Sequence, residues 1–151
     1  MTPDARSGGF TLIELLLVVA LIAVASGLAT FAIRDPSSTQ LENEAARLAS
    51  LLEAARAQSR ATGIAVRWEP RPITPGSSGF RFAGLTRGND LPSKWLGEGV
   101  SAEIVGQPAL VLGPEPIIPP QRVVLRLNDQ RLTLATDGLA PFAVVEDEAA
   151  S

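Results

Sequence analysis

The longest apolar segment of the chain lies near its start. Residues 10–33 read FTLIELLLVVALIAVASGLATFAI, and Glu14 is the one charged residue among them. As an α-helix this segment would extend roughly 36 Å at about 1.5 Å per residue, enough to cross a bilayer core of about 30 Å. A helix buried in a protein core is rarely apolar on every side over such a length. The pattern therefore predicts a membrane-spanning helix over residues 10–33.

A cleaved secretory signal peptide is the alternative for this segment. Residues 1–9 are polar and include Arg6, and residues 23–25, Ala-Val-Ala, resemble a small-residue cleavage site. Two features oppose this reading. The apolar run continues to Ile33, and Glu14 lies inside it, where a carboxylate costs roughly 2.5–3.5 kcal/mol at the membrane centre. A carboxylate near the headgroups needs no partner, whereas one deeper in the membrane indicates function and a positively charged partner.

Residues 8–14, Gly-Gly-Phe-Thr-Leu-Ile-Glu, resemble the signal of type IV pilins and of type II secretion pseudopilins. That signal is a short polar leader and a glycine, followed by Phe-Thr-Leu-x-Glu at the start of an apolar helix. The resemblance implies that a prepilin peptidase cleaves after Gly9 and methylates the new amino group of Phe10. It also implies that Glu14 sets the registration of subunits in a helical filament. After such a cut the Phe10 amine would lie about one helical turn from Glu14, of its own chain or of a neighbour.

A second helix is predicted over residues 34–62. Pro36 lacks an amide hydrogen, so it kinks the first helix or starts a new one, and Gly63 is a typical helix end. We expect the apolar stripe of this helix to pack on the chain's own sheet rather than in a coiled coil. The stripe consists of Leu41, Ala45, Leu48, Leu52 and Ala55. The charged residues predicted for its other faces are Glu42, Glu44, Arg47, Glu53 and Arg56.

Beyond Gly63 the apolar residues recur at every second position, which predicts strands. The clearest pattern is a hairpin, with strands at residues 122–127 and 130–135 joined by a tight turn at Asn128-Asp129. Further strands are predicted at residues 64–69, 79–83, 100–105, 109–112 and 141–145.

Two segments rich in proline, residues 70–79 and 113–121, are predicted as loops because proline is a poor residue for a central strand. In the second segment Ile117 and Ile118 either tuck under the sheet or contact a neighbouring subunit. The chain ends in the acidic residues Glu146-Asp147-Glu148, and residues 147–151 are predicted to be disordered.

These elements predict an α+β fold in which a long N-terminal helix packs on antiparallel sheet, as the resemblance to pilins also implies. The predicted order is a leader, a transmembrane or filament-core helix, an amphipathic helix that joins the globular domain, a β-rich periplasmic domain and a disordered tail. Their bounds are residues 1–9, 10–33, 34–62, 63–146 and 147–151.

Weaker similarity covers most of the remaining chain. Residues 41–48, residues 79–82 with Trp95, and residues 137–142 are similar to the helix, middle strands and C-terminal turn of H-type minor pseudopilins, the GspH/FimT group. This implies a structural subunit of a type II secretion pseudopilus, beneath the tip complex of I, J and K types. The alternative is a minor pilin of a type IV pilus, which serves pilus assembly or DNA uptake.

The same resemblance implies partners and a location. The partners are the major pseudopilin, the I/J/K-type tip subunits and a prepilin peptidase. The protein would cross the bacterial inner membrane once, with its globular domain in the periplasm, and would support export of folded proteins across the outer membrane. We expect no small-molecule substrate and no cofactor.

Composition argues against catalysis and nucleic-acid binding. The 151 residues include no His and no Cys, which removes the usual proton relay, the thiolate nucleophile and the zinc ligands. The net charge is −3 and Lys94 is the single lysine, although Arg122, Arg126 and Arg131 are predicted on one solvated face of the hairpin. Calcium at Asn89-Asp90 or Asn128-Asp129 would lack ligands. The remaining candidate catalytic carboxylates, none in a motif, are Asp90, Glu98, Glu103, Glu115, Asp129 and Asp137.

Overall fold

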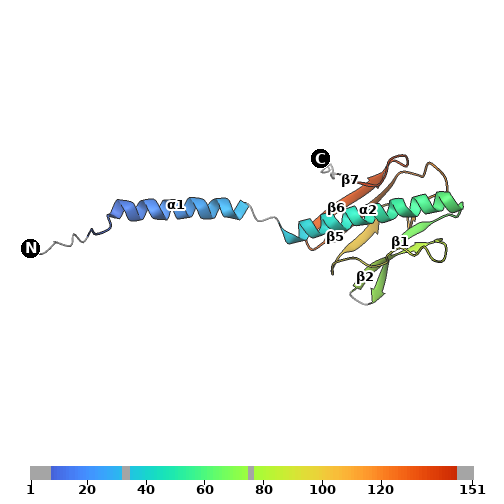
Figure 1. Ribbon diagram of the computed structural model, residues 1–151, viewed down its shortest axis with the longest axis horizontal. Coiled ribbons are helices and arrows are strands. Elements are labelled where there is room, and N and C mark those ends of the chain that lie inside the picture. Colours follow the sequence, from blue (N-terminus) through green and yellow to red (C-terminus); the bar gives the residue numbers. More distant parts are fainter. Residues whose placement is uncertain (1–7, 32–34, 75–76, 146–151) are drawn as a thin grey trace, which may run out of the picture. The chain divides into compact units, whose positions relative to one another are not determined.

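The computed structural model describes residues 8–31, 35–74 and 77–145. The chain forms two compact units, Met1–Asp35 and Pro36–Ser151. The first contains helix α1 (Leu12–Phe31), and the second contains helix α2 (Pro36–Thr62) and all the strands found among the described residues (Figure 1). Every residue of the buried hydrophobic core lies in the second unit, between Leu41 and Phe142. This unit therefore has the core of an independent domain.

Helix α2 begins at the residue that interrupts the apolar pattern. Pro36 is its first residue, a position where a missing amide hydrogen costs nothing because that hydrogen has no helical partner. The helix ends at Thr62, and the Gly63 N–H donates to Ser59 O at 2.9 Å with Gly63 at φ +70°. Pro36 thus starts a helix, while residues 32–34 lie outside the described residues.

The strands form two antiparallel sheets. One sheet has the order β3-β5-β6-β7, and the other has the order β2-β1-β4. Helix α2 contacts β5, β6 and β7 of the first sheet, and it runs along these strands in Figure 1. The fold is therefore α+β and of the pilin-like kind that the sequence predicts. The bounds are β1 (Arg67–Thr74), β2 (Ser77–Ala83), β3 (Ser101–Ile104), β4 (Leu110–Val111), β5 (Gln121–Leu127), β6 (Gln130–Thr136) and β7 (Ala143–Val145).

The core forms where the apolar stripe of α2 meets the alternating residues of the sheets. The predicted stripe is buried in full, and it clusters with Val123, Leu125 and Leu134 of the hairpin. An aromatic group completes the core on the side of the three-stranded sheet, where Phe80 lies 5.8 Å from Trp68 and 4.7 Å from Trp95 between ring centroids. Burial of apolar area on this scale is the main stabilising contribution to a domain of this size.

The predicted hairpin is confirmed. β5 and β6 pair antiparallel from Gln121 opposite Thr136 to Leu127 opposite Gln130. Asn128 in the turn has φ +52°, a conformation that asparagine tolerates better than most residues. The buried residues of β5 alternate with the exposed Arg122 and Arg126.

The prediction of a loop over residues 70–79 is wrong. Pro70 and Pro72 lie in β1 and pair with β2, opposite Phe80 and Ser78. β1 is central in its sheet, but it pairs with β4 only at Arg67 and Trp68, so the prolines lie where one side of β1 has no ladder. The Phe80 N–H donates to Ser93 O rather than toward Pro70. Both prolines thus occupy positions where no ladder bond requires an amide hydrogen.

The second proline-rich segment forms a loop before β5, and one of its two isoleucines is buried while the other is exposed. Ile118 is 3% exposed and belongs to the core, whereas Ile117 is 63% exposed. The Ile118 N–H donates to Gly138 O at 3.3 Å, which ties this loop to the turn before β7. Ile118 therefore tucks under the sheet, and Ile117 remains available at the surface.

Candidate functional site

The start of α1 is a capped helix preceded by an exposed, non-helical segment. The Thr11 hydroxyl and the Thr11 carbonyl both accept from the Glu14 N–H, at 3.3 and 3.1 Å, and the carbonyl also accepts from Leu15 N–H at 3.2 Å. Threonine is a preferred residue before the first helical turn because its oxygen satisfies one of the amides that the helix leaves unpaired. The sequence therefore ends the extended segment at Thr11 and begins the helix at Leu12.

The segment before this cap is accessible. Phe10 is 84% exposed, and Gly8 and Gly9 are exposed as well. A Cβ atom added at Gly9 would meet no atom within 4 Å, and the same holds for Gly8. The described residues therefore give no internal packing reason for a glycine at position 9. A requirement for glycine there would have to come from a protein that binds this segment.

Glu14 is the third residue of α1 and its side chain is exposed. Its place in the first turn is favourable, because the partial positive charge of a helix N-terminus attracts a carboxylate. Within the described residues no hydrogen bond or ion pair involves the Glu14 carboxylate. A cationic partner for it therefore has to come from a group outside these residues or from another chain.

Large apolar side chains surround Glu14 on α1. The ten described from Leu12 to Val24 are all exposed, on every side of the helix. The membrane span predicted over residues 10–33 includes residues 32–34, which lie outside the described residues. Among the helices of the described chain, none combines the length and the apolar character needed to cross a membrane.

Comparison with known proteins gives one match. Residues 4–30 match the family profile of the prokaryotic N-terminal methylation motif. This match supports a type IV pilin-like protein. No curated protein and no solved structure matches the chain. The pilin-like motif implies processing by a prepilin peptidase and assembly with other pilins, and it indicates membrane-anchored assembly.

The globular unit carries a second feature, a polar clamp between α2 and the turn before β7. Arg56 donates from Nη2 to Gly138 O and from Nη1 to Ala140 O, both at 3.2 Å. Arg56 Nη1 lies 3.1 Å from Glu53 Oε1 in an ion pair. The same Oε1 atom accepts a hydrogen bond from the Phe142 N–H at 3.2 Å. Arg56 is only 3% exposed, so its charge is compensated by a carboxylate and two carbonyls away from water.

The turn at residues 137–142 is also braced from within. The Asp137 carboxylate accepts from the N–H groups of Ala140 and Leu139, at 2.8 and 2.9 Å, and these bonds hold its pKa below the usual value. Gly138 has φ +97°, and a Cβ atom there would lie 1.9 Å from Ile118 O. Asp137 is therefore engaged in shaping the turn, which makes it a poor candidate for a general base.

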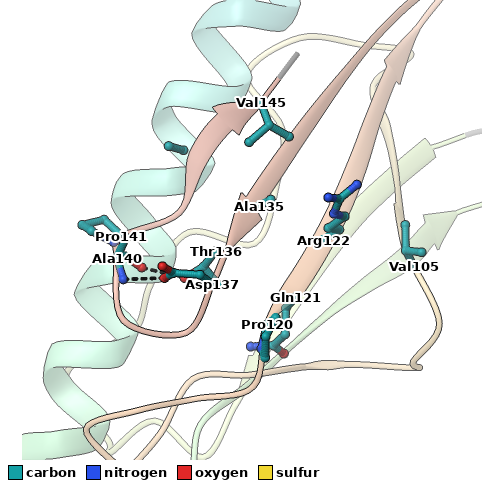
Figure 2. A pocket seen from close by; sticks show the side chains of 11 residues that line it. Val105, Pro120, Gln121, Arg122, Ala135, Thr136, Asp137, Ala140, Pro141 and Val145 are labelled. Carbon is teal, nitrogen blue, oxygen red and sulfur yellow. Dashed lines mark hydrogen bonds between the residues drawn. The ribbon is translucent and has the colours of Figure 1, made fainter. Parts of the chain in front are cut away.

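An open groove lies beside this turn on the four-stranded sheet. Its volume is about 600 Å³, and Figure 2 shows Arg122, Ala135 and Val145 on the strands, Val105 just after β3 and Pro141 on the turn. The lining is mostly apolar, with Arg122 and Asp137 as its charged side chains. No group of three or more metal-ligating side chains occurs in the described part of the chain. The groove offers a contact surface rather than a set of reacting groups.

The prediction that Glu44 and Arg56 lie on the solvent-facing sides of α2 is wrong. Glu44 is 1% exposed and Arg56 is buried too. Glu44 Oε1 accepts from Gly97 N–H at 2.8 Å, and Arg47 Nη1 lies 3.7 Å from Oε2. The sequence spacing could have indicated this burial. Glu44 follows Leu41 by three residues and Arg56 follows Leu52 by four, which places both charged residues on the apolar stripe of the helix.

Proposed function

We propose that the protein is a minor pseudopilin of the H type, a structural subunit of a type II secretion pseudopilus that acts without catalysis. The methylation motif at residues 4–30 carries this proposal. Support comes from an α+β globular unit that contains all the described core residues. The subunit would lie beneath the tip complex and support export of folded proteins across the outer membrane. Its helix would be anchored in the inner membrane, with the globular unit in the periplasm.

The first step of the proposed mechanism is cleavage after Gly9. The exposed segment before Thr11 suits a peptidase, and its glycines have no packing role among the described residues. Cleavage would release residues 1–9 and leave Phe10 as a methylated N-terminus. Intact mass of the protein from its native membrane should show this loss together with one added methyl group.

A pair of glycine variants sharpens this test. Gly9→Leu is expected to block processing, while Gly8→Leu, at an equally open position, serves as the matched control. Because a Cβ atom added at either position would meet no atom within 4 Å, the two positions are equally open, and a local clash would not explain a difference between the variants. Normal maturation of Gly9→Leu would overturn the assignment of the cleavage site.

The second step is registration of the subunit through Glu14. An N-terminal amine in the filament would pair with this carboxylate and compensate the loss of its hydration among apolar helices. Glu14→Ala is expected to leave the globular unit folded and to reduce the amount of subunit in sheared filaments. Glu115→Ala, which removes an exposed acid in a loop, is the control. Equal incorporation of the Glu14→Ala variant would refute the pairing.

The partners follow from the proposed place in the filament. We expect the unit Pro36–Ser151 to bind the I/J/K-type tip subunits and the major pseudopilin of the same cell. We expect no nucleic acid, small-molecule substrate or cofactor to bind. Co-purification with each set of subunits tests this directly. Binding only to subunits of a type IV pilus, or to DNA, would replace the secretion proposal with the minor-pilin alternative.

A further inference from the structure

The three-stranded sheet carries two exposed cationic residues on either side of a glycine. Arg71 of β1 lies opposite Gly79 of β2, and Lys94 lies opposite the same glycine on its other side. Directly opposite residues of antiparallel strands point to the same face, so the three positions form one row across the sheet. With neighbouring strands about 4.8 Å apart, the Cα atoms of Arg71 and Lys94 are separated by roughly 10 Å. Gly79 contributes no side chain to the space between them.

Arg81 adds a third cation beside this row. It follows Gly79 by two residues on β2, so its side chain points to the same face of the sheet. Arg71, Arg81 and Lys94 line a hollow of about 520 Å³, which is called the cationic notch below. The rest of the lining consists of Pro72, Phe80 and Ser93.

The cationic notch keeps an excess of positive charge. Glu69 Oε2 accepts from Arg81 Nη2 at 2.7 Å, so Arg81 has a carboxylate partner. Among the ion pairs of the described residues, none involves Arg71 or Lys94, and no described acidic residue lines the hollow. Two positive charges therefore lie here without a carboxylate, in a chain whose net charge is −3.

We propose that the cationic notch binds a phosphate group, as the free ion or as a monoester, between Arg71 and Lys94. A phosphate monoester carries about −1.5 to −2 charges at neutral pH, which matches the two cations that have no carboxylate. A carboxylate would neutralise only one of them. The planar guanidinium of Arg71 suits two parallel hydrogen bonds to phosphate oxygens, and the ammonium group of Lys94 adds a compact charge from the other side.

The role of the third cation differs from that of the other two. Its ion pair with Glu69 holds the Arg81 side chain at the edge of the hollow, where it adds to the local positive potential without giving up its partner. Both members of that pair are about one third to one half exposed, so the pair is screened and of modest strength. The proposed site concerns the globular unit alone and does not depend on the proposed place in a filament.

Lys94 offers a direct probe because it is the single lysine of the chain. Reductive methylation with ¹³C-formaldehyde keeps its positive charge and labels only Lys94 and the N-terminal amine. We expect the dimethyl-lysine signal of the full chain in an uncharged detergent to shift saturably with inorganic phosphate at constant ionic strength. Acetate should bind several-fold more weakly. A shift that does not saturate, or equal affinities for acetate and phosphate, would overturn the proposal.

A matched pair of variants separates the site from the general effect of charge. Arg67 lies on the same strand and the same face as Arg71 and is also exposed, but it does not line the hollow. Arg71→Gln and Arg67→Gln remove the same charge. We expect Arg71→Gln to weaken phosphate binding several-fold and Arg67→Gln to leave it nearly unchanged. Equal weakening by both variants would overturn the site, because binding would then follow overall charge.

The source of the phosphate group is distinguished by a second probe. Glycerol 3-phosphate presents the monoester found in the simplest lipid headgroup, whereas inorganic phosphate is the free ion. Tighter binding of glycerol 3-phosphate supports a site for esterified phosphate, and tighter binding of inorganic phosphate supports a site for the free ion. Failure of both probes to shift the Lys94 signal would overturn the proposal and leave the proposed function of the chain untouched.

Discussion

Arg56 joins two parts of the fold that are far apart in sequence. Its guanidinium binds two turn carbonyls and one carboxylate, and it is nearly fully buried. Arg56→Ala leaves the Gly138 and Ala140 carbonyls and the Glu53 carboxylate without this donor, which should lower the free energy of unfolding by about 3 kcal/mol. Urea unfolding of the unit Pro36–Ser151 measures this. The exposed Arg60→Ala is the control, with an expected change within about 0.5 kcal/mol.

Asp137 links the stability of the turn to pH. Backbone N–H groups of Ala140 and Leu139 lower its pKa in the folded state, while in the unfolded chain the value is about 3.9. The stabilisation is therefore present above the unfolded value and is lost as the pH falls through the lower folded value. Asp137→Asn should be less stable than the wild type at neutral pH, and the difference should shrink in acid. Urea titrations from neutral to strongly acidic pH test this, and a constant difference would contradict it.

Gly138 is required by its conformation and by its surroundings. An alanine there would adopt φ +97° and place Cβ against Ile118 O. We expect Gly138→Ala to destabilise the domain by about 2 kcal/mol or more. Gly88 has φ +91° with no atom within 4 Å of an added Cβ, so Gly88→Ala carries the backbone strain alone. Thermal unfolding of both variants separates the two contributions, and equal losses would rule out the close contact.

At the scale of elements, β1 shows how a strand accommodates proline. Pro70 opposes Phe80 at a position without a ladder bond, so by the alternation of antiparallel pairs Glu69 opposes Arg81 at a bonded position. Glu69→Pro should therefore cost about 2 kcal/mol or more through the lost bond. Pro70→Thr should change stability by less than about 1 kcal/mol. Denaturant unfolding that ranked the two variants in the reverse order would contradict this register.

The hairpin and the amphipathic helix could be predicted because their signals are local. Alternation in β5 and β6 and the residues of the turn at Asn128 fix pairing over a short stretch of chain. The strand at Pro70 could not be predicted in this way. A proline is tolerated there because β4, an element distant in sequence, stops pairing with β1 before that residue. The roles of Glu44 and Arg56 depend on partners at Gly97 and Gly138 that no local pattern names.

For the candidate site the sequence was more informative than the fold. Gly9, Phe10 and Glu14 were singled out by a contiguous motif, and the structure adds the Thr11 cap and the open surroundings of the glycines. Among the described residues no hydrogen bond or ion pair involves the Glu14 carboxylate, and the partner proposed for it is an amine in an assembly. A contiguous motif therefore sufficed to indicate these residues, because it depends on no long-range contact.

At the scale of the whole molecule, the two units should behave independently in stability measurements. All core residues lie in Pro36–Ser151, and none lies in Met1–Asp35 among the described residues. The unit Pro36–Ser151 alone should therefore unfold cooperatively, with the same urea midpoint as the full chain in detergent. Glu14→Ala should leave that midpoint unchanged. A lower midpoint in either case would show that the first unit supports the globular core.

The hydrogen bonds of Arg56 also constrain the order in which the parts of the globular unit can fold. Its bonds join residues 82 and 84 positions apart, and the bond from Phe142 to Glu53 spans 89. Closing loops of this length is entropically costly and slow compared with forming a helix or a hairpin. During synthesis α2 emerges early, yet its buried arginine has no carbonyl partners until Gly138 and Ala140 follow. The domain is therefore completed only after the turn from Gly138 to Phe142 has been made, long after α2 has left the ribosome.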